Sequence, residues 1–284
     1  MESPADTYTL NNGVKIPCLG YGTWQMPNDE SGVAAVKSAV SAGYRHIDTA
    51  AVYGNEESVG RGVRECGLPR SEIFVTSKVW NSERGYRKTL AAFESSMEKL
   101  GLDYLDLYLV HWPEPARGEP ERWRGVNLQT WRALEELYAK GRVKSIGVSN
   151  FLPHHLEPLL AEAQVRPAAN QIEFHPGFMQ KGALDFCVEN GILVEAWSPL
   201  GSGKLLENDA LARIAHKYSR SPAQICLRWC LQHGTLPLPK SVTEARMAEN
   251  ARIFDFEIAE GDMSIIDAMP YSGGSGLDPD KIDF

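Results

Sequence analysis

Apolar, β-branched runs alternate with longer segments of helical periodicity along nearly the whole chain. Many of the helical segments end at or just before a glycine, as a C-terminal cap requires. The predicted strands are residues 18–24, 45–48, 73–78, 105–111, 143–150, 168–174, 192–197 and 235–240, and the helices between them are 32–43, 55–66, 86–101, 127–141, 153–163, 181–191 and 221–234. Strict alternation implies a parallel sheet with right-handed crossovers. Eight strands favour an α/β fold that closes into a (β/α)₈ (TIM) barrel.

A few segments fall outside the eight repeating units. Residues 8–16 are predicted to form a β-hairpin with Asn12-Gly13 in its turn, which would cover the bottom of the barrel. Residues 208–220 predict an extra helix after the seventh strand, and a further helix is expected near the C-terminus. Because no proline- or serine-rich linker divides the chain, we expect one domain over residues 1–284. The glycine-rich, acidic tail 271–284 is either a mobile terminus or a lid over the mouth.

The net charge limits which partners are expected, and the lack of targeting or membrane-spanning segments limits the expected location. The chain has 284 residues and a formal net charge of −8, which argues against nucleic acid or an anionic membrane as the main partner. A local basic cluster can still bind a small anion. The chain has neither a signal peptide nor an apolar run of about 20 residues, so a cytoplasmic location is expected.

The five cysteines are scattered and odd in number, which is typical of reduced thiols. Cys226 and Cys230 share a helix face and could hold zinc, but no second pair of ligands lies near them in sequence. Core thiols are therefore the simpler interpretation. His154 and His155 are adjacent and are expected to point in different directions, so the sequence predicts no metal site.

Four polar residues follow the second, third and fourth predicted strands: Asp48 with Tyr53 after it, then Lys78, then His111. A parallel barrel brings these strand ends together at one mouth, where active sites lie. Tyrosine is a weak acid with a pKa of about 10, and a neighbouring lysine cation lowers that value. Each residue alone could be a helix cap, a solvated cation or a half-buried side chain. Together they predict a proton-transfer site, with the aspartate holding the lysine and the histidine bonding the substrate oxygen.

A separate anion site is predicted after the eighth strand. Lys240, Ser241 and Arg246 place two cations and a hydroxyl beside the start of a helix, a good setting for phosphate. The alternative is a capped, solvated helix start. The segment SPLGSGKLL is not a Walker loop, since a glycine is missing and Leu205 replaces the Ser/Thr. No GxGxxG follows an N-terminal strand either, so the common dinucleotide fold is not indicated.

The chain resembles a known family, the aldo-keto reductases, in several motifs. The similar motifs are GYRHIDTAAVYGNE, VTSKVWN, LYLVHWP, IGVSNF, NQIEFHP and LPKSVTEARMAEN, and the match runs from about residue 8 to about residue 269. The bacterial branch with 2,5-diketo-gluconate reductases and prostaglandin F synthase-like enzymes is the most similar. The resemblance implies a monomeric barrel that reduces aldehydes or ketones by hydride transfer from C4 of NADPH, without a metal. It also implies that Tyr53 is the general acid and that Asp48, Lys78 and His111 are its catalytic partners.

The resemblance also implies which residues hold the cofactor and the substrate. Trp197 would stack on the nicotinamide, and Arg246 would contact the adenosine 2′-phosphate. The implied cofactor residues are Ser149, Asn150, Gln171, Trp197, Ser198, Leu200, Gly201, Lys240, Ser241, Val242, Thr243, Arg246, Glu249 and Asn250. The implied substrate residues are Tyr21, Trp24, Trp80, His111 and Trp112. Glu244 stands where the family often has proline, and its negative charge bears on the choice between NADPH and NADH.

Two other classes of protein are compatible with the sequence. A non-enzymatic NADPH-binding regulator, like channel β subunits, could use the same fold. A metal-dependent barrel hydrolase would need histidines and carboxylates at the strand ends, and the first strand ends in GYGTW without a ligand. The expected partner is a small carbonyl substrate, with no nucleic acid and no membrane.

Overall fold

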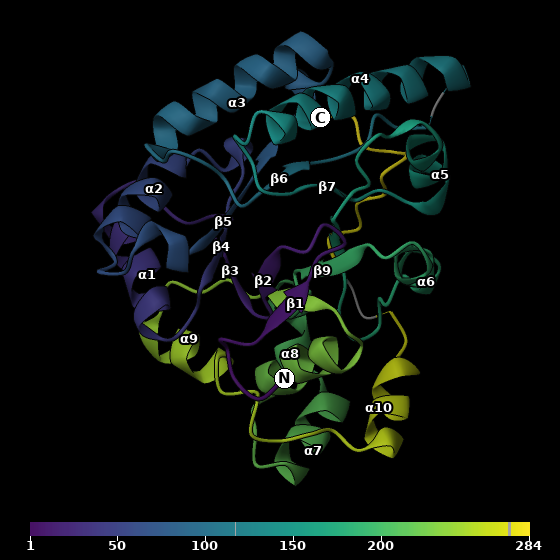
Figure 1. Ribbon diagram of the computed structural model, residues 1–284. Coiled ribbons are helices and arrows are strands. Elements are labelled where there is room, and N and C mark those ends of the chain that lie inside the picture. Colours follow the sequence, from purple (N-terminus) through teal and green to yellow (C-terminus); the bar gives the residue numbers. More distant parts are fainter. Residues whose placement is uncertain (117, 272–273) are drawn as a thin grey trace.

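The computed structural model describes residues 1–116, 118–271 and 274–284. Eight parallel strands form one sheet in chain order from β3 to β10, which confirms the predicted (β/α)₈ barrel (Figure 1). The strands are β1 (Thr7–Thr9), β2 (Lys15–Pro17), β3 (Gly20–Gly22), β4 (His46–Asp48), β5 (Phe74–Val79), β6 (Leu107–Val110), β7 (Ile146–Ser149), β8 (Ala169–Glu173), β9 (Leu193–Trp197) and β10 (Leu236–Leu238). The N-terminal strands β1 and β2 form the predicted antiparallel hairpin.

The barrel closes where β3 meets β10. The backbone N–H of Gly22 donates to the carbonyl of Pro239 at 3.0 Å, next to the end of β10. A Cβ at Gly20 would lie 2.3 Å from Cδ2 of Leu238 and 2.8 Å from Nδ1 of His46, so a larger residue here would require these inner side chains to move. Strand β3, at the edge of the sheet, therefore presents only the glycines Gly20 and Gly22 on its inner face.

The α-helices surround the sheet (Figure 1). They are α1 (Glu30–Ser41), α2 (Glu56–Glu65), α3 (Tyr86–Leu100), α4 (Pro120–Ala139), α5 (Pro153–Glu162), α6 (Lys181–Glu189), α7 (Asp209–Lys217), α8 (Pro222–Gln232), α9 (Glu244–Asn250) and α10 (Glu260–Asp267). The extra helices α7 and α10 occur where they were expected. The sequence placed the start of α4 too late, at residue 127. The helix begins at Pro120 because proline at the first helical position loses no backbone hydrogen bond.

Side chains alternate between the inside and the outside of the barrel, as the period of a strand requires. The lower half of the interior is apolar and includes Phe74, Leu107 and Leu236. Leu10 and Ile16 of the hairpin segment pack on this cluster and cover the bottom. Asp48, Lys78 and His111 lie nearer the C-terminal strand ends, opposite the hairpin, whereas the polar inner residues His46 and Glu195 are level with Phe74 and Leu236.

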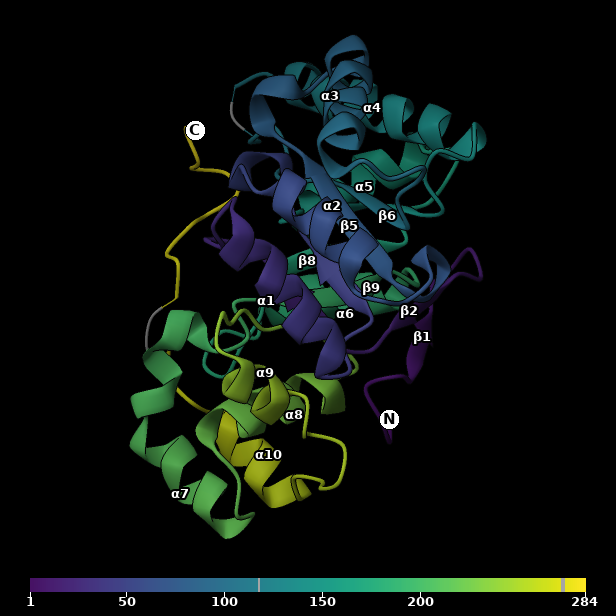
Figure 2. The same ribbon diagram turned by 90° about the vertical axis from the view of Figure 1, so that its left-hand side faces the viewer.

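The tail after α10 runs along the side opposite the hairpin and ends beside the mouth (Figure 2). Ser272 and Gly273 of the tail, like Arg117 in the connection after β6, lie outside the described residues. All five cysteines are free thiols. Burial raises the pKa of Cys226 to about 12, in agreement with a core thiol. No helix in the described ranges combines the length and hydropathy that a membrane span needs.

Candidate active site

The four predicted catalytic side chains meet at the C-terminal mouth. Asp48 ends β4, Lys78 lies on the inner face of β5, and His111 follows β6. Tyr53 ends a short 3₁₀ helix, η1 (Ala51–Tyr53), which the left-handed Gly54 terminates. Strands β4, β5 and β6 therefore position Asp48, Lys78 and His111, and the tight turn after β4 positions Tyr53.

Lys78 is the centre of the cluster and is completely buried. Its Nζ lies 2.7 Å from Asp48 Oδ1, 3.0 Å from the Thr49 carbonyl and 3.4 Å from the Tyr53 hydroxyl. Burial acts to lower the pKa of Lys78, but Asp48 and Tyr53 outweigh it, so the net pKa is raised. The ammonium is therefore charged at neutral pH and directly faces the phenol.

The balance at Tyr53 differs from the sequence-based expectation. Burial raises the pKa of the Tyr53 phenol more than the Lys78 cation lowers it, and Asp48 adds to the increase. In the free protein the hydroxyl is therefore protonated at neutral pH. Lys78 does lower the pKa of Tyr53, as expected, but burial has the larger effect. Removing a phenolate from water destabilises it more than one neighbouring cation stabilises it.

His111 packs edge-on against Tyr53, with 5.7 Å between the ring centroids. Burial lowers the pKa of His111 well below its usual value, and the Lys78 and Arg84 cations lower it further. The imidazole is therefore neutral at physiological pH and carries one N–H. Such a group can donate a hydrogen bond to an oxygen without itself carrying positive charge.

Aromatic side chains form one wall of the mouth. Trp80 contacts His111 edge-on at 5.1 Å and stacks on the ring of Phe284 at 5.5 Å with an interplanar angle of 6°. Trp112 meets the same Phe284 ring edge-on at 5.8 Å. The C-terminal residue Phe284 thus belongs to a wall for which the sequence predicted the tryptophans and Tyr21.

The other two predicted substrate residues lie differently. Trp24 follows β3 and is 57% exposed. Tyr21 is buried on the outer face of β3, where it packs against Tyr44 and donates to the carbonyl of Ser241 at 2.5 Å. The structure thus places Tyr21 as a support of the segment after β10, because its neighbours Gly20 and Gly22 occupy the inner face.

The predicted nicotinamide residues form a hydrogen-bonded chain across the strand ends. Ser149 Oγ donates to the Gln171 carbonyl at 2.7 Å. Asn150, with a positive φ of 64°, donates to the His111 carbonyl at 2.9 Å and accepts from Trp197 Nε1 at 2.8 Å. The hydrogen bond that Trp197 donates to Asn150 fixes the half-buried indole at the end of β9.

The loop after β9 is shaped by left-handed residues. Ser198 and Ser202 have positive φ angles of 52° and 55°, and their hydroxyls are 3.0 Å apart. The Gly201 N–H donates to the Ser198 carbonyl at 2.8 Å. Leu200 immediately precedes the irregular 3₁₀ segment η4 (Gly201–Glu207). These turns hold the predicted pyrophosphate segment in a compact loop next to Trp197.

The segment after β10 presents exposed cations. Lys240 and Arg246 are both exposed, and neither has an ion-pair partner within residues 1–116, 118–271 and 274–284. The Ser241 hydroxyl accepts the Thr243 N–H at 3.0 Å, and the carboxylate of Glu244 accepts from Ser38 on α1 at 2.6 Å. Val242 is exposed, Glu249 is half-buried and Asn250 is buried.

The tail is fastened at the mouth by polar contacts. Ser275 donates to Glu173 from its backbone N–H at 2.8 Å and from its hydroxyl at 2.5 Å. Asp280 accepts the backbone N–H of Ala116 at 3.0 Å, and Asn81 Nδ2 donates to the Phe284 carbonyl at 3.1 Å. Of the two interpretations of the tail, these bonds favour the lid.

The expectation that His154 and His155 point in different directions is wrong. Their rings lie 4.1 Å apart, and both Nε2 atoms lie 2.9 Å from oxygens of Asp280. The tail brings the carboxylate to the start of α5, a contact that helix geometry alone does not reveal. His155 Nδ1 accepts the Leu152 N–H at 3.2 Å, which leaves the ring proton on Nε2. In that tautomer, Nε2 offers no lone pair to a metal ion.

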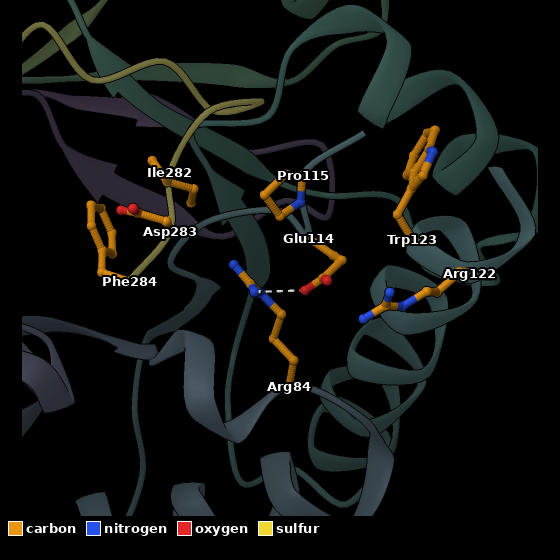
Figure 3. A pocket seen from close by; sticks show the side chains of 8 residues that line it. All are labelled: Arg84, Glu114, Pro115, Arg122, Trp123, Ile282, Asp283 and Phe284. Carbon is orange, nitrogen blue, oxygen red and sulfur yellow. Dashed lines mark hydrogen bonds and ion pairs between the residues drawn. The ribbon is translucent and has the colours of Figure 1, made fainter. Parts of the chain in front are cut away.

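Beside the mouth, a cavity of about 320 Å³ separates the tail from the start of α4. Figure 3 shows Arg84 and Arg122 directed into it, with Arg84 bound to Glu114 at 2.8 Å. Phe284 and Trp123 also line the cavity. Arg84 further donates to the carbonyls of Trp112 and Pro113, so it braces the loop that carries the aromatic wall.

A buried polar network beneath the four residues was not predicted. Gln171 Nε2 donates to Asp48 Oδ2 at 2.9 Å and to Glu195 Oε2 at 3.0 Å. Glu195 lies on the inner face of β9, with its Oε1 at 3.9 Å from His46 Nε2. The one sequence signal was a charged residue in the middle of the apolar run ILVEAW, where a buried charge needs a partner.

The geometry of the mouth indicates a class of protein. A parallel barrel whose mouth joins a tyrosine, a charged lysine with its aspartate, and a neutral histidine has the groups that proton transfer to a substrate oxygen would require. A family model described as "Aldo/keto reductase family" matches residues 18–270. The chain belongs to the aldo/keto reductase family and is an oxidoreductase.

Individual relatives are similar in sequence or structure over almost the full length of the chain. The chain is 51% identical over 279 residues to a glyoxal reductase of Bacillus subtilis, covering 98% of each sequence. A solved aldo/keto reductase from Brucella melitensis is 49% identical, with a TM-score of 0.87, and the match covers 94% of this chain and 98% of that one. A mutant of Gox0644, solved in complex with NADPH, is 43% identical with a TM-score of 0.90 and 99% coverage of both chains.

Proposed function

We propose that the chain reduces small aldehydes or ketones to alcohols with NADPH, and that Tyr53 donates the proton. The observation that carries this proposal is the 3.4 Å contact between the Tyr53 hydroxyl and the buried Lys78 ammonium, beside neutral His111. NADPH supplies a hydride to the carbonyl carbon when it is bound. The similarity to a glyoxal reductase supports small dicarbonyl compounds as first substrates to test.

Each protein group has one task in this scheme. His111 donates a hydrogen bond to the carbonyl oxygen and orients it. The protonated Tyr53 gives its proton to that oxygen as negative charge develops. Lys78 stabilises the phenolate left behind, and Asp48 holds the ammonium in place at 2.7 Å. The wall of Trp80, Trp112 and Phe284 limits the access of water to the reacting atoms.

The residues around the mouth fit the proposed cofactor. The indole of Trp197, held by Asn150, offers a flat face for a nicotinamide ring. The cations of Lys240 and Arg246, which have no ion-pair partner among the described residues, suit a phosphate group. The carboxylate of Glu244 is engaged by Ser38, which reduces its conflict with a bound phosphate. The NADPH complex of the Gox0644 mutant supports the same choice of cofactor.

The proposal is tested by following NADPH absorbance with glyoxal, methylglyoxal and aromatic aldehydes. We expect turnover of at least one of these carbonyls that is absent with NADPH alone. Bound NADPH without turnover of any carbonyl, particularly in an oligomer, would favour the regulator alternative instead. Sizing the same preparation tests the further proposal that the active species is a monomer.

Replacing Arg246 by alanine is expected to weaken NADPH binding by about 10- to 100-fold and to leave NADH binding within about twofold. A charge-assisted hydrogen bond contributes about 1.5–3 kcal/mol, and only NADPH has the 2′-phosphate to receive it. Fluorescence titration with both cofactors measures the difference. Arg252, an exposed arginine just after α9, provides the matched Arg252→Ala control. Equal losses for the two cofactors would refute the 2′-phosphate assignment.

Replacing Phe284 by alanine is expected to lower kcat/KM for methylglyoxal by about tenfold, or about 1.4 kcal/mol. The ring stacks on Trp80, so its loss opens the pocket and weakens the contact with small substrates. Bulky aromatic ketones should lose less, or gain. The ratio of kcat/KM for the two substrate classes measures the change. Leu277→Ala alters an exposed tail residue and serves as the control; an unchanged ratio in Phe284→Ala would contradict the lid.

A further inference from the structure

One amide nitrogen links two carboxylates inside the barrel. Gln171 Nε2 lies 2.9 Å from Asp48 Oδ2 and 3.0 Å from Glu195 Oε2, and a primary amide has one hydrogen for each. Both carboxylates are buried. Asp48 thereby uses its two oxygens for different partners, Oδ1 for Lys78 and Oδ2 for Gln171.

The charges in this part of the interior do not balance if both carboxylates are ionised. The facing titratable groups are His46 and Asp48 on β4 and Lys78 on β5, while β8 contributes Gln171 and β10 contributes apolar Leu236. Burial and the Lys78 cation lower the pKa of His46 to about 3, so its ring is neutral. One cation therefore faces two carboxylates in a dry environment, where an unpaired charge is costly.

The contacts of Glu195 favour its protonated form. Lys78 contacts Asp48 at 2.7 Å, whereas the nearest partners of Glu195 are the Gln171 amide and, at 3.9 Å, the neutral His46 ring. Burial raises the pKa of Glu195 to about 8, and the charge of Asp48 contributes to the increase. At neutral pH the network therefore holds one cation, one anion and one protonated acid.

We propose that Glu195 is a positioning residue of the active site, a buried neutral acid that orients Asp48 toward Lys78 through the shared Gln171 amide. This inference rests on the proposed reductase function. The Gln171 amide donates one hydrogen to Asp48 and the other to Glu195, so these two acceptors together fix the orientation of the amide. The amide in turn keeps Asp48 in the position where it serves Lys78.

Ionisation of Glu195 has a definite consequence for the reaction. A second anion near Lys78 competes with the Tyr53 phenolate for the same positive charge. The phenolate that forms on proton donation is then less stable, so reduction slows as the pH rises through the pKa of Glu195. An uncharged amide at position 195 cannot ionise, and it keeps nearly the same shape and one polar oxygen.

The first test compares the pH dependence of kcat for carbonyl reduction between pH 6 and pH 10. We expect the wild-type protein to lose about tenfold between pH 7 and pH 9, and Glu195→Gln to remain within about twofold over that range. Glu56→Gln alters another buried carboxylate, bound by Ser77 rather than by the active-site network, and should behave like the wild type. An unchanged alkaline loss in Glu195→Gln would overturn the proposal.

The second test does not depend on turnover. The infrared difference spectrum of wild type minus Glu195→Gln should show the carbonyl band of a protonated carboxylic acid at pH 7, which fades above about pH 8. The absence of that band at pH 7 would refute a neutral Glu195. A protein that binds NADPH but reduces no carbonyl would contradict the proposed function, and the infrared band would still decide the protonation of Glu195.

Discussion

Tyr53→Phe is expected to reduce carbonyl turnover by about 10²- to 10⁴-fold, the usual contribution of a positioned general acid. The substitution removes only the hydroxyl that lies 3.4 Å from Lys78 Nζ. The ring and its edge contact with His111 remain, so the pocket keeps its shape. We therefore expect NADPH affinity within about twofold of the wild type. Steady-state turnover and fluorescence titration of the same preparation measure the two quantities.

A matched control separates the role of this phenol from the general effect of losing a hydroxyl. Tyr108 is also buried, and its hydroxyl has no hydrogen-bond partner among the described residues. Tyr108→Phe should leave turnover unchanged and should not destabilise the fold, because it removes an unsatisfied polar group. Near-normal turnover in Tyr53→Phe would remove Tyr53 as the acid.

Lys78→Met is expected to abolish measurable turnover and to destabilise the protein by about 3–5 kcal/mol. The ammonium is fully buried and is the direct ion-pair partner of Asp48, so its removal leaves an uncompensated carboxylate in the barrel. Urea unfolding at pH 7 measures the free energy of unfolding.

The double variant Asp48→Asn/Lys78→Met distinguishes the two effects of the lysine. Without either charge, the buried site has no unpaired ion, so we expect most of the lost stability to return. Turnover should stay absent, since nothing stabilises the Tyr53 phenolate. Recovery of both stability and turnover would show that the lysine has a structural role only.

Much of the fold followed from local patterns. The eight strands, the bottom hairpin and the extra helices were predicted because side-chain alternation and helical periodicity are properties of neighbouring residues. The start of α4 was misplaced because charged residues follow Pro120 and obscure the periodic pattern. Strand order also brought Asp48, Lys78 and His111 to one mouth, since parallel strands in a barrel end on the same side.

The sequence by itself determined the order of the strands and the residue types at their C-terminal ends, which is enough to predict the architecture and its four-residue cluster. Only the tertiary structure decided that burial outweighs Lys78 at Tyr53, and that Gln171 joins Asp48 to Glu195. It also decided that Phe284 packs on Trp80 and that Asp280 meets two histidines. These contacts join residues that are far apart in the chain. The energies of the contacts depend on burial and distance in the folded interior, and the spacing of residues along the chain does not reveal either quantity.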